Sequence, residues 1–123
     1  MLNRSDNIIV EKTEKFADRI VKMSRYLSKK KIDNPEILKQ IVRSGTSVGA
    51  NTAESQYAQS KADFLTKLTI ALKEANETKF WLSRLYAANH LSETEYNSII
   101  NDNLEIIKIL TSITKTVKRS QYV

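Results

Sequence analysis

The sequence predicts an all-α protein, an antiparallel up-down-up-down four-helix bundle that forms a single domain over residues 1–123. Two glycines and one proline in the whole chain leave few of the breakers that hairpins require. Apolar residues recur at helical spacing in four segments, near residues 7–27, 35–58, 61–88 and 93–116. The connections are short, which makes neighbouring helices antiparallel. No cysteine is present, so disulfides and thiolate metal sites are excluded.

The first helix is predicted from an apolar series at helical spacing: Ile9, Phe16, Ile20, Met23 and Leu27. Asn34 and Pro35 then mark the start of the second helix. Asparagine can cap a helix, and proline at the first helical position gives up only an N–H that has no partner there. The face expected to be buried on the second helix consists of Leu38, Ile41, Val42, Gly45, Val48, Gly49 and Thr52.

The third and fourth helices each follow a capping-box pattern. Ser60 precedes Asp63 by three residues, and Ser92 stands in the same relation to Glu95. The expected apolar face of the third helix is Phe64, Leu68, Ala71, Leu72, Ala75, Leu82 and Tyr86. That of the fourth is Tyr96, Ile99, Ile100, Leu104, Ile107, Leu110, Ile113 and Val117. The residues after Lys115 are expected to form a frayed basic tail.

Both glycines of the chain lie in the stretch RSGTSVGANTAES, within the second helix. A phosphate-binding loop would need a lysine after its last glycine and a strand before the loop, and neither is found. Gly45 and Gly49 are four residues apart and share the buried face. Each costs about 1 kcal/mol of helix propensity relative to alanine. They therefore predict a flat strip that another helix approaches closely.

A polar stripe lies opposite this strip, and the third helix carries polar and apolar groups away from its main buried face. Antiparallel pairing places Arg43 level with Ala75, and so predicts an ion-pair cluster of Arg43 with Glu74 and Glu77. The pattern leaves open whether it closes within one chain or between two; we expect it to tie subunits together. Trp81 either adds a second contact surface or lies on its own bundle. The interface candidates are Arg43, Ser47, Asn51, Glu54, Glu74, Glu77 and Trp81.

The net charge of +6 is concentrated in the first segment, where residues 1–31 hold nine Lys or Arg against four Asp or Glu. A basic patch of this kind favours a phosphate-bearing partner, although a solvated helix end explains the same charges. Base-specific reading is not expected, because Tyr26 is the only aromatic residue among the lysines. The candidates for nucleic-acid contact are Arg19, Lys22, Arg25, Lys29, Lys30 and Lys31.

Catalysis would have to use His90, the only histidine of the chain. Arg84 and His90 have the spacing of the Arg-x(4–6)-His signature of helical-bundle ribonucleases of the HEPN class, in which histidine assists proton transfer. Leu85 stands where those enzymes usually carry a polar residue. A turn histidine near a helix C-terminus is the simpler interpretation, and the sequence predicts no catalytic residue.

A metal site could use oxygen ligands from Glu54, Glu74 and Glu77. Metal sites in helical bundles normally include Glu-x-x-His pairs, and this chain has none. An ion pair with Arg43 accounts for the same glutamates. The sequence therefore predicts no metal and no cofactor.

The stretch RSGTSVGANTAES, followed by DFLTKLTIALKEANETKFWLSRL, resembles a family of small bacterial four-helix-bundle proteins. These are named after open reading frames in intervening sequences of 23S ribosomal RNA genes. Thr52-Ala53 stands where Ile-Ala is usual, and Gly49 where a larger residue is common. The positions that match the family pattern are Arg43, Ser47, Asn51, Glu54, Phe64, Glu74, Glu77 and Thr78.

The resemblance implies a homo-oligomer, typically a pentamer, with no established catalytic residue. A related branch, the accessory proteins of diversity-generating retroelements, binds nucleic acid alongside a reverse transcriptase. We therefore expect a non-enzymatic, cytoplasmic scaffold, without a membrane segment, whose basic surface contacts RNA or DNA backbones. The alternative is an adaptor for an acidic protein, such as one encoded by a neighbouring gene. A helical-bundle ribonuclease is a more distant one.

Overall fold

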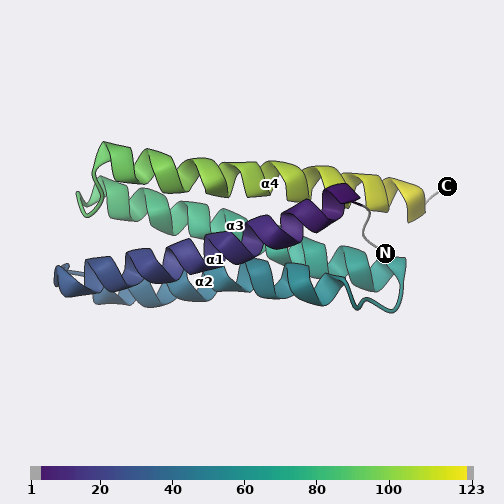
Figure 1. Cartoon of the computed structure of the whole chain (residues 1–123), viewed down its shortest axis with the longest axis horizontal. Helices are drawn as coiled ribbons and strands as arrows, with labels where there is room; N and C mark the ends of the chain where they lie inside the picture. The colour runs from purple at the N-terminus through teal and green to yellow at the C-terminus, as the bar shows by residue number, and fades with distance from the viewer. Residues whose placement is uncertain (1–3, 122–123) are drawn as a thin grey trace.

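A computed structural model describes residues 4–121 as four helices: α1 (Arg4–Lys29), α2 (Pro35–Ser55), α3 (Lys61–Ala87) and α4 (Glu93–Gln121). Each helix packs against the next in the sequence, and α1 also contacts α4, which confirms the up-down bundle (Figure 1). Figure 1 shows α1 crossing the bundle obliquely, from the start of α2 toward the far half of α4. Over residues 4–121, no helix has both the length and the apolar content needed to cross a membrane.

The ends of the helices differ from the prediction in places. The basic tail predicted after Lys115 is helical as far as Gln121, the last described residue. Val117 is half-buried against the core, and this packing holds the last turns of α4 against the bundle. At the other end, α1 begins at Arg4, and residues 1–3 and 122–123 of the predicted domain lie outside the described residues.

The predicted caps are confirmed for two helices and wrong for one. The Ser92 backbone N–H donates to the Glu95 carboxylate at 2.8 Å, and the Glu95 N–H donates to the Ser92 hydroxyl at 3.1 Å, which completes a capping box. Ser60 accepts from the Asp63 N–H at 3.0 Å. Asn34 makes no side-chain cap, although Pro35 opens α2 as predicted.

The core follows the predicted faces except along one edge of α3 and α4. Leu104, predicted to be buried, is 42% exposed, while Ile106 and Asn103 are buried. The Asn103 amide donates to the Ala75 carbonyl oxygen of α3 at 3.2 Å. A polar residue on the buried face shifts the apparent apolar stripe by one position, which is why the pattern favoured Leu104.

On α3, Leu85 is buried, whereas the predicted Tyr86 is 38% exposed. The Tyr86 ring stacks on that of Tyr96 of α4, with centroids 4.4 Å apart. This aromatic pair covers the rim of the core rather than filling it.

Close approach of α1 to α2 confirms the role predicted for the two glycines. A Cβ atom added to Gly45 would lie 2.9 Å from both Cγ1 and Cγ2 of Ile20, and one on Gly49 would lie 3.1 Å from the Thr13 carbonyl oxygen. Neither glycine has a positive φ, so space rather than backbone freedom explains them. Thr13, Ile20, Gly45 and Gly49 are all buried.

We expect Gly45→Ala to destabilise the protein by about 1 kcal/mol. Overpacking against Ile20 costs about 1–3 kcal/mol, and this outweighs the gain of about 1 kcal/mol in helix propensity. Urea unfolding followed by circular dichroism measures the difference. Ala50→Gly, at an exposed position of the same helix, is the matched control and reports propensity alone. A Gly45→Ala protein more stable than the wild type would contradict the close approach.

Candidate nucleic-acid interface

The basic residues of α1 gather at the end of the bundle where α1 turns into α2. Lys22, Arg25 and Lys29 are exposed on one face of α1, because residues three and seven apart share a helix face. We call these three the basic row. Lys30 and Lys31 follow the last helical residue, and Lys31 turns the chain with a φ of 54°. The ion pairs found within residues 4–121 include none of these five side chains.

Arg19, also predicted to contact nucleic acid, is engaged within the bundle. Its Nη1 lies 2.5 Å from the Asp102 carboxylate of α4, and its Nη2 donates to the Ser98 hydroxyl at 3.0 Å. Lys12 forms a second bridge between the same helices, 2.6 Å from Glu105. Arg19 therefore links α1 to α4, and its charge is partly neutralised.

Lys30 lies over the ring of Tyr26, with its Nζ 4.3 Å from the ring centroid. The Tyr26 hydroxyl, and to a smaller extent Glu95, raises the pKa of the Lys30 ammonium above its ordinary value. Lys30 is therefore a cation at neutral pH and adds a fourth positive charge next to the basic row.

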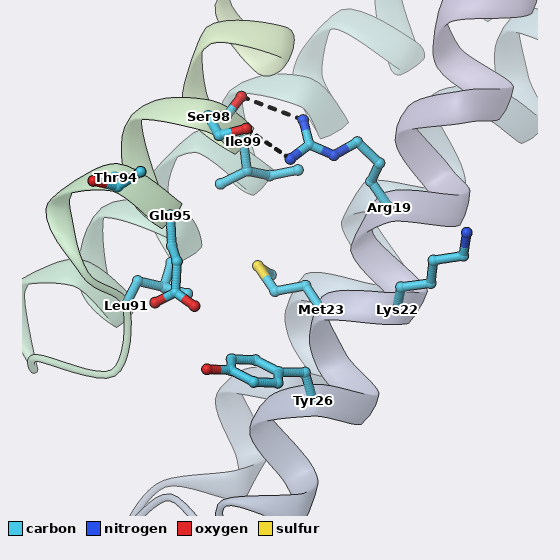
Figure 2. A pocket seen from close by; sticks show the side chains of 9 residues that line it. All are labelled: Arg19, Lys22, Met23, Tyr26, Leu91, Thr94, Glu95, Ser98 and Ile99. Atoms are coloured by element: carbon cyan, nitrogen blue, oxygen red, sulfur yellow. Dashed lines mark hydrogen bonds between the residues drawn. The ribbon is translucent and has the colours of Figure 1, made fainter.

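Beyond Arg19 the helices α1 and α4 leave a groove of about 510 Å³ between them (Figure 2). Tyr26 and Met23 extend from α1 on one side, and Glu95 and Leu91 lie opposite. Arg19 closes one end through its hydrogen bonds to Ser98. The full lining is Arg19, Lys22, Met23, Tyr26, Leu91, Thr94, Glu95, Ser98 and Ile99.

The sequence did not predict this groove, because its walls come from segments about seventy residues apart. Met23 and Ile99 were assigned to the core, and Thr94 and Ser98 carried no signal. Helical periodicity shows which face of a helix points inward, but it does not show where two helices separate.

Glu95 is the only acidic residue that lines the groove. The hydrogen bond from the Ser92 backbone N–H is the main cause that lowers the pKa of its carboxyl, with smaller contributions from Tyr26 and Lys30. The cap uses Oε1 of this carboxylate. Glu95 therefore stays ionised at neutral pH and presents a fixed acceptor at the groove.

The predicted cluster of Arg43 with Glu74 and Glu77 forms between α2 and α3. Arg43 Nη1 lies 3.1 Å from Glu74 Oε2, and its Nη2 pairs with Glu77. The Trp81 indole N–H donates to Glu77 at 3.3 Å, and its ring packs partly against the bundle's own core. The ion pairs therefore close within one chain.

Ser47, Asn51 and Glu54 continue along α2 but form separate contacts. The Asn51 amide donates to the Ser47 carbonyl oxygen at 2.9 Å and to its hydroxyl at 3.1 Å. Glu54 pairs with Lys67 of α3 at 2.9 Å. These residues link α2 internally and to α3, and they do not extend the Arg43 network.

His90 belongs to the structure that ends α3. Asn89 adopts a left-handed φ of 62°, its N–H donates to the Tyr86 carbonyl, and the His90 N–H donates to the Leu85 carbonyl. This is the Schellman arrangement of a helix C-terminus. Arg84, the other residue of the ribonuclease-like spacing, lies 5.7 Å from the centroid of the Phe80 ring.

The glutamates weighed as metal ligands are held apart by their ion pairs. Glu74 and Glu77 share Arg43, whereas Glu54 faces Lys67. Within the described part of the chain, no group of three His, Asp or Glu residues is placed to hold a metal ion.

Comparisons with known proteins point to one family. A sequence profile described as "23S rRNA-intervening sequence protein" matches residues 5–112. A crystal structure from Bacteroides thetaiotaomicron VPI-5482, of a protein with unknown function from the S23 ribosomal protein family, is similar over 90% of this chain and 98% of that chain. The two share 48% identity, with a TM-score of 0.83. Comparison with the curated proteins finds no match.

The lowered pKa of Glu95 predicts a pH-dependent contribution to stability. A depressed carboxyl pKa stabilises the fold above the unfolded pKa of about 4.3, and this is lost as pH falls through the folded value. Glu95→Gln should therefore lower the free energy of unfolding at pH 7, with the gap to wild type closing toward pH 3.

The matched control is Glu93→Gln, which removes an exposed carboxylate from the same first turn of α4. It reports the loss of the helix-dipole interaction alone. Equal costs for both variants at pH 7 would contradict the special position of Glu95. Urea titrations at a series of pH values make this comparison.

Proposed function

The chain belongs to the 23S rRNA-intervening sequence protein family, and from this membership and its surface we propose a non-enzymatic, homo-oligomeric accessory protein that contacts RNA or DNA backbones. The family relationship supports the fold and leaves the activity open. The proposal of nucleic-acid contact is based on the basic row. The proposal of a homo-oligomer is based on a separate surface of α3.

The single observation behind nucleic-acid contact is the basic row itself. Lys22, Arg25 and Lys29 are exposed, share one face of α1 and take part in none of the ion pairs of the described chain. At 1.5 Å per residue the row spans about 10 Å of helix. Since one strand of a duplex advances about 3.4 Å along the axis per phosphate, the row matches about three phosphates.

A non-enzymatic role is supported by what surrounds the candidate catalytic residues. His90 follows the left-handed Asn89 in the Schellman turn, which gives this position a structural reason. Arg84 lies near the Phe80 ring, where a cation–π contact explains it. Glu74 and Glu77 both form ion pairs with Arg43.

Assembly with further copies of the chain is supported by the outer face of α3. Phe80 is 52% exposed, and Ile70 and Trp81 add apolar surface along the same helix. Lys73 and Arg84 are exposed on the same face and border this apolar surface. We propose a homo-oligomer, with the pentamer as the subunit number to test.

We expect Lys22→Gln, Arg25→Gln and Lys29→Gln together to weaken binding to a labelled duplex RNA and to flatten its salt dependence. Three lost phosphate contacts reduce the slope of log affinity against log salt by about 2–3. Fluorescence anisotropy over a range of potassium chloride concentrations measures both quantities.

The control for this triple variant is Lys61→Gln, Lys115→Gln and Lys118→Gln, which removes the same charge from the other end of the bundle (Figure 1). Its salt slope should stay near that of the wild type. Equal losses in the two triple variants would indicate a general charge effect and contradict an interface at the basic row. Salt-independent wild-type binding would point instead to a protein partner.

Sedimentation equilibrium should give a mass that is a multiple of the 14.1 kDa chain, fivefold for a pentamer. Phe80→Glu should reduce this mass, because a carboxylate on an apolar interface loses its solvation. Tyr57→Glu, at an exposed aromatic residue of the α2–α3 turn, is the matched control. A wild type that sediments as a single chain at high micromolar concentration would overturn the assembly.

A further inference from the structure

The groove between α1 and α4 adjoins the basic row and is built differently from it. Its floor and walls include Met23, Leu91 and Ile99, and the Tyr26 ring is 44% exposed at its edge (Figure 2). Lys22 belongs to both features, since it lines the groove and stands in the row. Any chain of phosphates held by the row therefore passes the mouth of an apolar groove.

We propose that this groove takes an unpaired base of a single-stranded nucleic acid, and that it prefers bases with an exocyclic amino group. The inference rests on the proposed nucleic-acid function and adds which strand type and which bases the site selects. From the sequence, Tyr26 alone offered too little surface to bind a base. The groove changes this expectation, because residues of α4 form a second wall opposite Tyr26.

The apolar lining favours a base over a phosphate. Aromatic rings and apolar side chains stack with or pack against any base, whereas a phosphate would lose its hydration among Met23, Leu91 and Ile99. The volume of about 510 Å³ also lies in the range of small-molecule sites.

Glu95 gives the groove its chemical selectivity. Its carboxylate lies opposite Tyr26, and its charge repels phosphate groups (Figure 2). A carboxylate only accepts hydrogen bonds, so it pairs with the amino groups of cytosine, adenine or guanine. Uracil carries no amino group, and its one ring donor, the N3–H, stands between two carbonyl oxygens that the carboxylate repels. The cap holds one carboxylate oxygen on the Ser92 N–H, and the Tyr26 hydroxyl also interacts with the carboxylate, so an entering amino group displaces this hydroxyl.

A duplex does not satisfy this arrangement. Its bases are stacked and paired, and the major groove of A-form RNA is too deep and narrow for side chains to read. An unstacked base of a single strand can enter the groove while its neighbouring phosphates lie along Lys22 and Arg25. The bridge from Arg19 to Asp102 and Ser98 sets the spacing of the two walls.

The test compares three fluorescein-labelled RNAs by anisotropy: a cytidine 12-mer, a uridine 12-mer and a 12-base-pair duplex. The wild type should bind the cytidine strand more tightly than the other two. Tyr26→Ala should lose about tenfold in affinity for the cytidine strand, the size expected for one stacked base, and should bind the duplex as before. Tyr26→Phe keeps the ring and should retain most of the affinity.

Glu95→Gln is the sharper variant, because glutamine also serves in a capping box and keeps the start of α4 intact. Its amide donates as well as accepts, so the preference for cytidine over uridine should disappear while duplex binding stays unchanged. The salt slopes of the groove variants should equal that of the wild type, since no phosphate contact is removed.

The outcomes separate the two proposals. If all three RNAs bind through the basic row, but without strand preference and without loss in Tyr26→Ala and Glu95→Gln, the base groove is overturned and the proposed function stands. If none of the RNAs binds at low salt, both proposals fail.

Discussion

The close contact between α1 and α2 at Gly45 and Gly49 is the constraint on which the rest of the molecule depends. With no side chain at either position, Ile20 and the Thr13 backbone lie directly against α2. A helix held this tightly at its middle has little freedom to follow a second neighbour along its whole length. It meets α4 near Lys12 and Arg19, and it leaves α4 beyond Arg19, where the groove opens. The two glycines therefore influence the shape of the groove, although they contact the opposite side of α1.

The bridges between α1 and α4 set geometry more than stability. Arg19 with Asp102 and Lys12 with Glu105 are partly exposed pairs, and such pairs contribute about 0–1 kcal/mol each. Removing one would change the fold little. The Arg19 guanidinium also donates to the Ser98 backbone carbonyl and hydroxyl. These bonds fix the position of α1 along the axis of α4. This explains how a loosely packed helix pair keeps a groove of defined shape.

The sequence could predict what repeats along one helix or connects neighbours in the chain. Helical spacing gave the four helices, capping patterns gave the starts at Ser60 and Ser92, and antiparallel level-matching gave the pairing of Arg43 with Glu74 and Glu77. The prediction of the core was wrong where a polar side chain lies on the buried face. Asn103 is buried there because its amide donates to a carbonyl oxygen of α3, and Leu104 is exposed instead. The groove could not be predicted from the sequence, because the separation of α1 from α4 depends on the packing of α1 against α2.

The helix dipole accounts for some of the positive charges at the basic end of the bundle but not for all of them. Lys29, Lys30 and Lys31 stand at the C-terminus of α1, where cations are favourable for the helix itself, so their presence has a structural reason. This effect falls off within the last turn. Lys22 and Arg25 lie before that turn, and neither takes part in an ion pair of the described chain. The helix dipole therefore does not account for these two charges. These two residues, beside the groove, are therefore the main support for the proposed phosphate-bearing partner.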